Sequence, residues 1–200
     1  MSRRLRFGGE IAGLGTTSGV RVVVGRWTTS PYGTFADVML QQADGWRVLL
    51  APTQEIAEFI ASTYVFDEVV VGPVAAERAV SDVSVAAPGL GLGFVVGPRT
   101  GLGRLLRLVP PRIATAPTWS RLIAPVSGLL VPGVRTYGSA GADRWEAYGA
   151  TDRHAITAAA GIWRGLPLGD LAPVEPPVSV GFASTPRAPG LTTLVTTVGG

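Results

Sequence analysis

VRVVVGRWTTSPYGTFADVMLQQADGWRVLLAP, residues 20–52, is the stretch that decides the fold class of this chain. Runs rich in valine and other apolar residues alternate here with short groups of turn residues, which is typical of antiparallel strands. An Asp44-Gly45 pair separates FADVMLQQ from WRVLLAP, and such a pair favours a hairpin. The sequence therefore predicts strands joined by tight turns in this part of the chain.

The next segment, TQEIAEFIASTY (residues 53–64), has helical spacing. Its apolar residues recur about one turn apart from Ile56 to Tyr64, and Thr53 is suited to cap the N-terminus. Period-two patterns then predict more strands, in residues 65–74, 81–97, 155–165, 178–184 and 191–198, and a second hairpin in residues 134–150 around Gly141.

Residues 99–132 interrupt the β pattern. Leucines from Leu102 to Leu106 predict a short helix that Pro110 and Pro111 end, and the rest of this region is expected to be extended. Many short strands with one or two short helices indicate an α+β fold, mostly β: an antiparallel β-barrel or strongly curved sheet enclosing a pocket. We expect a single domain over residues 1–200, because this length suits one core.

Composition excludes several chemistries. The chain has no cysteine, so disulfides, thiolate nucleophiles and cysteine-ligated zinc are excluded. All 17 basic residues are arginine, and without lysine a phosphate loop of the Walker type is excluded. His154 is the one histidine, so we expect no metal and no other cofactor. No signal-like or membrane-spanning apolar run is found, which predicts a cytoplasmic protein without a transmembrane segment.

Arginines accumulate between Asp82 and Asp143, where the chain has no acidic residue. This region is a candidate basic surface for anionic lipid or a protein partner, and scattered solvated arginines are the alternative. Aromatic residues do not interleave with the arginines, so no nucleic-acid partner is expected. Association into a homo-oligomer through an edge strand stays open.

One predicted strand face carries a charge among apolar residues. Alternation places Asp37 on the same face as Phe35 and Met39, and Arg26 shares its alternation with the preceding valines. A carboxylate and a guanidinium inside a barrel are costly alone and tolerable as a hydrogen-bonded pair, which is a common way to build a ligand site. The alternative is a bulge near Gly33 that shifts the register and sends Asp37 to solvent.

Four segments carry a family resemblance. SPYGTFADVML (residues 30–40) resembles the G-P-Y-x-E strand of acetoacetate decarboxylase-like proteins, and PTWSRLIAPVSG (117–128) resembles their P-T-F-x-x-K-x-I-P segment. AAAGIWRG with LAPVEPPVSVGF (158–182) resembles their W-x-G strand and closing L-P-V strand. The order agrees over roughly residues 28 to 185. The resemblance implies an antiparallel β-barrel around a small pocket, and keto-acid chemistry through a Schiff base on a lysine.

The chain departs from that family at its reactive groups. Asp67 and Glu68 stand about where the family has its lysine pair, and Thr34 replaces the glutamate of G-P-Y-x-E. Because no lysine exists anywhere in the sequence, a lysine Schiff base is excluded. Adjacent residues of a strand face opposite sides, so at most one of Asp67 and Glu68 is expected in the pocket, and both on its rim is the alternative.

Two functions are compatible with this pattern. The first is a barrel that binds a small molecule and acts as a lyase or hydratase on a carbonyl or carboxylate compound, with Asp37, Asp67 and Glu68 as proton-transfer candidates. Arg26 would then anchor an anion and Tyr32 would donate a hydrogen bond. The second is a non-catalytic binding protein for an apolar or lipid-like ligand, whose arginine-rich region contacts a membrane or protein partner. Converging charged groups would favour the enzyme, and an apolar cavity the carrier.

Overall fold

The computed structural model describes residues 4–130, 135–139, 144–181 and 184–200. The strands in these ranges are β1 (Arg4–Thr16), β2 (Arg21–Thr29), β3 (Phe35–Gln41), β4 (Arg47–Ala51), β5 (Glu68–Val71), β6 (Ala75–Ala79), β7 (Asp82–Ala87), β8 (Leu90–Arg99), β9 (Tyr137–Ser139), β10 (Trp145–Trp163), β11 (Leu166–Pro167), β12 (Leu171–Ala172) and β13 (Gly190–Gly199). The helices are α1 (Gln54–Ala61), α2 (Gly101–Leu106), α3 (Pro111–Ala114) and α4 (Pro117–Leu130).

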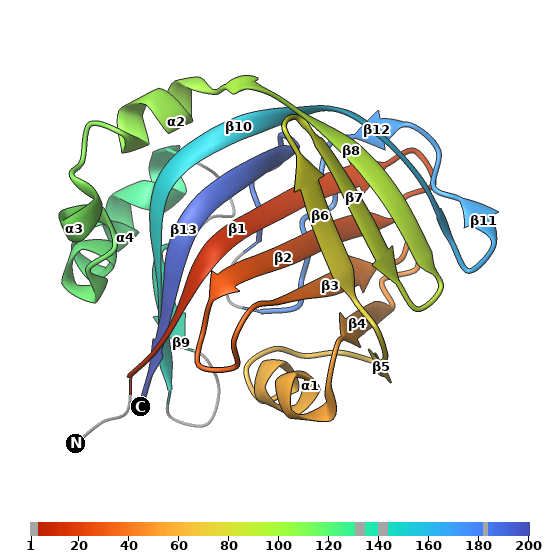
Figure 1. Cartoon of the computed structure of the whole chain (residues 1–200). Helices are drawn as coiled ribbons and strands as arrows, with labels where there is room; N and C mark the ends of the chain where they lie inside the picture. Colours follow the sequence, from red (N-terminus) through yellow and green to blue (C-terminus); the bar gives the residue numbers. More distant parts are fainter. Residues whose placement is uncertain (1–3, 131–134, 140–143, 182–183) are drawn as a thin grey trace.

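The strands described belong to one sheet, with the order β5-β4-β3-β2-β1-β13-β10-β8-β7-β6 along its main path. Neighbours pair antiparallel apart from β4 and β5, which are parallel. Figure 1 shows β10, β13 and β1 bending strongly, so that β6 to β8 lie across β1 to β3. The sheet thus curls into a half-barrel. The expected fold class is confirmed, although the described part of the chain has four helices instead of one or two.

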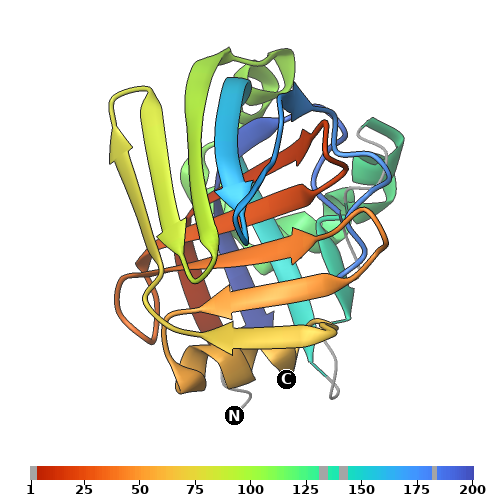
Figure 2. The same ribbon diagram turned by 90° about the vertical axis from the view of Figure 1, so that its right-hand side faces the viewer.

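The main apolar core lies inside this curl. Alternate residues of β2 and β3 pack against inward residues of β7 and β8, and Figure 2 shows the first pair of strands running across the direction of the second. The core includes Val22, Val24, Val38, Leu40, Val83, Val85, Leu92 and Phe94. Burying each such side chain contributes roughly 1.5–3 kcal/mol. This core therefore holds β2 and β3 against β7 and β8 across the curled sheet.

The opposite face of β2 and β3 turns away from that core. The strands pair in regular register, with Gly25 opposite Asp37, so the predicted alternation of Phe35, Asp37 and Met39 on one face is confirmed. Gly33 has a φ of +78° in the turn before β3, where it does not disturb the register. The hairpin predicted at the Asp-Gly pair is also confirmed, by the pairing of β3 with β4.

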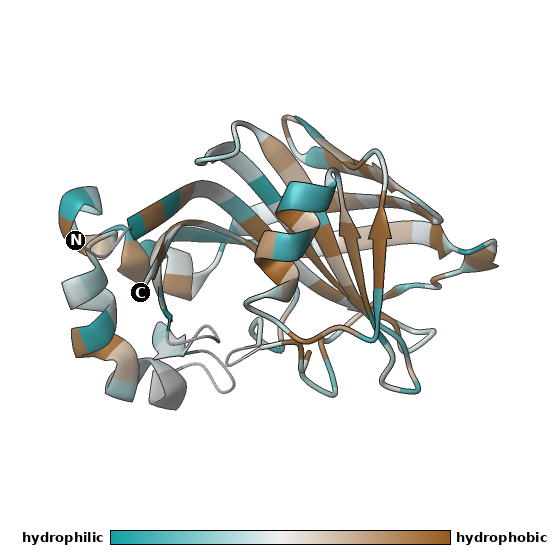
Figure 3. Ribbon diagram, turned by 90° about the horizontal axis from the view of Figure 1, so that it is seen from below, coloured by the Kyte–Doolittle hydropathy of each residue, from teal (hydrophilic) through white to brown (hydrophobic). Residues whose placement is uncertain are grey.

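Helix α1 confirms the prediction for residues 53–64. The Thr53 hydroxyl accepts a hydrogen bond of 3.3 Å from the backbone N–H of Ile56, which satisfies one free donor of the first turn. Ile56 and Ile60 are buried against Leu49 of β4. In Figure 3 α1 lies near the centre of the view, and α2 to α4 lie at the other end of the long strands. The two helical regions thus flank the space beneath the sheet.

The extended chain predicted after Pro110 is wrong, because α3 and α4 occupy this region. Pro111 and Pro117 each begin a helix, where the missing N–H has no partner to lose, so these prolines start helices instead of preventing them. Pro125 lies inside α4 and does not end this helix, although proline usually ends or kinks one. The short helix predicted before Pro110 is confirmed as α2.

The strand predicted for residues 178–184 is wrong over its described residues. Val178 and Val180 are buried, which explains the alternation, but the backbone of Ser179 donates to the Gln41 side chain instead of to a neighbouring strand. The other predicted strands are confirmed, within β5, β7, β8, β10 and β13. Strand β9 pairs with β10 as the second hairpin requires, and Gly141 itself lies outside the described residues.

Candidate functional site

A cavity of about 650 Å³ lies on the face of β1 to β3 that turns away from the main core. Ile11, Val23 and Met39 form its floor, α2 and α4 form one wall, and Val178, Val180 and residues 184–186 line another side. A smaller pocket of about 60 Å³ adjoins it and shares these three floor residues. The lining is largely apolar. Its charged side chains are Asp37 and Glu146 in the smaller pocket and Arg135 and Arg153 in the large cavity, and hydroxyl groups from β13, α4 and residues 184–185 are also present.

Asp37 lines the smaller pocket from β3 and is 2% exposed. The Trp27 indole N–H donates a 2.7 Å hydrogen bond to Asp37 Oδ1. Gly25 leaves room for this bond, because a Cβ there would lie 2.5 Å from the same oxygen. Burial raises the pKa of Asp37 to about 7, although the Trp27 hydrogen bond lowers it. The prediction that Asp37 points inward is confirmed, and the alternative that a bulge exposes it is wrong.

A second buried carboxyl, Glu146, was missed by the sequence reasoning. It lies at the start of β10, is 3% exposed, and accepts a 2.8 Å hydrogen bond from the Tyr64 hydroxyl. Tyr64 and Tyr148 hydroxyls are 2.8 Å apart. Burial raises the pKa of Glu146 to about 7, while the hydrogen bonds from Tyr64 and Tyr148 lower it. The available signal was the spacing of two between Glu146 and Tyr148, which puts both on one strand face.

Arg153, also on β10, lines the large cavity and was not predicted either. Its guanidinium NH1 donates to Thr192 Oγ1 at 2.9 Å and its NH2 donates to the Ala188 carbonyl at 2.6 Å. The side chain is 5% exposed, and burial lowers its pKa. Gly190 leaves space for this group, because a Cβ there would lie 2.6 Å from NH2.

A β-bulge determines that Arg153 faces the cavity. Strand β10 pairs Ala150 with Leu194 and Asp152 with Thr193, so Thr151 is an extra residue. Tyr148 and Ala150 line the cavity, and strict alternation would continue to Asp152. The bulge instead turns Asp152 away, where its carboxylate accepts a 2.8 Å bond from Arg99, and brings Arg153 inward. The cavity therefore receives a cation where regular alternation would place an anion.

Asp67 and Glu68 do not line either pocket, and the expectation that one of them does is wrong. Asp67 makes a bidentate ion pair with Arg47, at 2.8 and 2.9 Å, and these hydrogen bonds lower its pKa to about 2. Glu68 pairs with Arg164 and accepts a 3.3 Å hydrogen bond from Trp46. Both acids lie at the outer edge of the sheet and bind arginines, because β5 is the strand at which the sheet ends.

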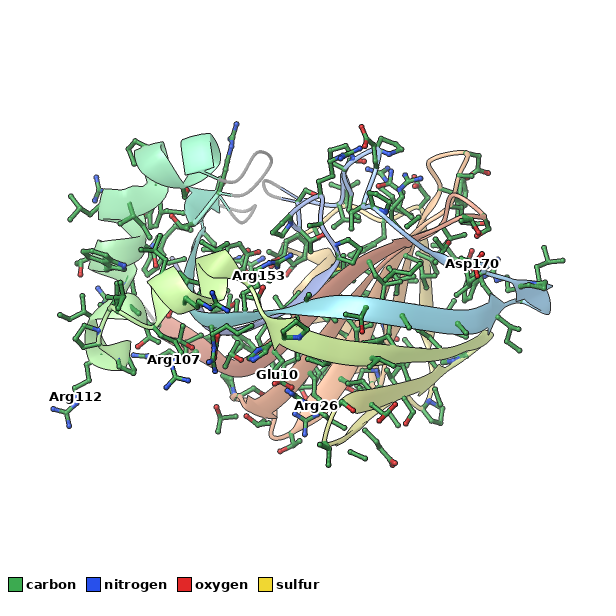
Figure 4. All side chains as sticks on the ribbon, turned by 90° about the horizontal axis from the view of Figure 1, so that it is seen from above. Glu10, Arg26, Arg107, Arg112, Arg153 and Asp170 are labelled. Carbon is green, nitrogen blue, oxygen red and sulfur yellow. The ribbon has the colours of Figure 1, made fainter. Side chains whose placement is uncertain are left out.

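Arg26 and Tyr32 also lie outside the cavity lining. Arg26 is on the face of the sheet opposite to that of Asp37 and pairs with Glu10 at 3.1 Å. The expected ion pair between Arg26 and Asp37 is therefore wrong. Glu10 and Arg26 lie side by side in Figure 4. The Tyr32 ring packs against Phe7, with ring centroids 6.2 Å apart, behind the wall of the smaller pocket. Of the five predicted site residues, Asp37 alone lines a pocket, the smaller one, and none lines the large cavity.

The described residues show neither a metal-binding cluster nor a membrane-spanning helix. Among the described residues, no group of three or more histidine, cysteine, aspartate or glutamate side chains could hold a metal ion. None of the helices described is long and apolar enough to cross a membrane. Comparison of the chain with protein-family models and with curated proteins finds no match.

Proposed function

We propose that this protein binds an elongated, largely apolar small molecule that ends in a carboxylate. The observation that carries the proposal is the buried guanidinium of Arg153 at the wall of an apolar cavity of about 650 Å³. Cavities of roughly 300–1,000 Å³ are the usual size for small organic ligands. The apolar residues of the wall would enclose the chain of the ligand, and Arg153 would bind its head.

The charge of Arg153 argues for an anionic ligand. Its two hydrogen bonds go to neutral groups, a threonine hydroxyl and a backbone carbonyl. Within the described residues no carboxylate is within ion-pair distance of this guanidinium. A buried cation without a counter-charge is costly, and a ligand carboxylate would offset that cost with hydrogen bonds in a planar, bidentate geometry.

A second candidate function is acid/base catalysis at the smaller pocket. Glu146 has a pKa near neutrality, about 7, and shares hydrogen bonds with Tyr64, as a proton donor or acceptor at physiological pH would require. The carbonyl oxygen of a bound ligand would accept hydrogen bonds from the tyrosine hydroxyls. The Glu146 carboxyl would give a proton to that ligand or take one from it. This is the lyase or hydratase hypothesis with Glu146 in the place of Asp67 and Glu68. The relationship to acetoacetate decarboxylase-like proteins also remains a proposal, supported by the curved antiparallel sheet.

The binding proposal can be tested with decanoate and 1-decanol, which differ only in their heads. We expect decanoate to bind at least about tenfold more tightly in titration calorimetry, because hydrogen bonds to charged groups are worth roughly 1.5–3 kcal/mol. Arg153→Gln should remove this preference, and the exposed Arg187→Gln should keep it. Equal affinity for acid and alcohol in the wild type would contradict the carboxylate assignment without any variant.

Cavity occupancy has a separate test. Ala150 lines the cavity beside Arg153, so Ala150→Phe would fill part of the space without changing charge. We expect this variant to lose binding of both decanoate and 1-decanol. Retained binding of both would place the ligand elsewhere on the protein.

A further inference from the structure

We propose that the surface formed by α2 to α4 docks on an anionic lipid membrane. We define this helical patch by its exposed residues, which are Arg104, Leu105, Arg107, Leu108, Arg112, Ile113, Arg121 and Leu122. Figure 1 shows the three helices grouped at one end of the molecule, beside β10. Docking of this patch does not depend on which ligand fills the cavity, and the protein without a ligand can be used to test it.

Several large apolar side chains of this patch are exposed to solvent. Leu108 is 77% exposed and Leu122 is 70% exposed, and Leu105 and Ile113 are about half exposed at 52% and 48%. Exposed apolar residues that gather on one face mark sites of interaction with proteins or membranes. The patch therefore has the apolar component of a docking surface.

The apolar part of the patch is also the mouth of the cavity. Leu105, Leu108 and Leu122 line the large cavity and are at the same time exposed to solvent. The cavity consequently opens between α2 and α4, at the surface that these leucines form. Contact of this face with a bilayer would put the mouth of the cavity against the lipid, so that an apolar ligand could enter without crossing water.

The charge of the patch selects the kind of membrane. Its four arginines are exposed, and the sequence has no acidic residue between Asp82 and Asp143 to neutralise them. In Figure 4 Arg107 and Arg112 point outward from the helices, whereas Arg153 lies beside α2 where β10 passes it. Arginines around exposed leucines fit a surface of anionic headgroups over acyl chains. A nucleic acid would match the arginines but leave the leucines in water.

Vesicle co-sedimentation tests this surface directly. We expect the wild type to bind vesicles of phosphatidylcholine mixed with phosphatidylglycerol, to bind vesicles of phosphatidylcholine alone at least about tenfold more weakly, and to be released by salt. The double variant R107E/R112E should lose at least about tenfold in binding to the anionic vesicles. The matched double variant R6E/R187E changes the net charge equally at exposed residues that do not belong to the patch and should bind like the wild type.

The apolar component is tested by Leu108→Gln, which should weaken binding at constant charge. The proposal is overturned if the anionic vesicles do not bind, or if both double variants lose binding equally, since net charge alone would then explain the result. It is also overturned if sedimentation velocity shows a wild-type dimer that L108Q dissociates, because the patch would then bind a second copy of the chain.

Discussion

The two pairs of acids in this chain, Asp67 with Glu68 and Asp37 with Glu146, have opposite environments. Asp67 is bound by the Arg47 guanidinium at the sheet edge, and its pKa falls to about 2. Asp37 and Glu146 lie among apolar and aromatic side chains, and the pKa of each rises to about 7. The same chemical group is thus a permanent anion in one place and a titrating acid in the other. Burial and the partner decide its role, not its position in a motif.

The largest effect expected from this contrast is that of Asp37 on the pH dependence of the free energy of unfolding. Burial raises the pKa of Asp37 from 3.8 to about 7, so its contribution is fully present below pH 3.8 and is lost as the pH rises through 7. At roughly 1.4 kcal/mol per pKa unit, Asp37 alone accounts for up to roughly 4 kcal/mol. Asp37→Asn should therefore flatten the decline in the free energy of unfolding, measured by urea unfolding at pH 5 and pH 8. An unchanged pH profile would show that Asp37 ionises freely.

A smaller effect is expected when Glu146 loses a partner. Tyr64→Phe removes the hydroxyl that donates to Glu146, which should cost about 1–3 kcal/mol of stability because a buried carboxyl loses a hydrogen bond. The Tyr64 hydrogen bond lowers the pKa of Glu146, so this pKa should rise further in the variant. Carbon-13 NMR of labelled glutamate would measure the shift. A lower pKa in the variant would contradict the described geometry.

The smallest effect is expected at the sheet edge. Asp67→Asn should leave the urea midpoint at neutral pH close to that of the wild type, because exposed ion pairs contribute little and are screened by salt. Its lowered pKa contributes stability above pH 3.8 that is lost as the pH falls toward about 2, so the variant should lack this small contribution above pH 3.8 and also lack its decline on acidification. A large loss of stability in Asp67→Asn at neutral pH would contradict the distinction between the two pairs of acids.

Local patterns predicted the sheet and its first helix well. The alternation of β2 and β3 placed Asp37 on the correct face, and the Thr53 cap located the start of α1. The site was harder to predict because it depends on contacts between distant segments. Tyr64 and Glu146 are 82 residues apart, and neither has a neighbour in sequence that reveals the pairing. The prediction that Arg26 points into the cavity was wrong for a different reason. Even and odd residues of β2 are both largely buried, so alternation alone does not say which face holds the cavity.

The bulge at Thr151 has a consequence for how this cavity could change. Asp152 and Arg153 are consecutive residues of opposite charge, and the backbone register decides which of them the cavity contains. The sign of the electric field at the wall is therefore encoded in strand geometry as much as in side-chain identity. A slip of one residue would put the Asp152 carboxylate at the wall in place of the Arg153 guanidinium while every amino acid stayed the same.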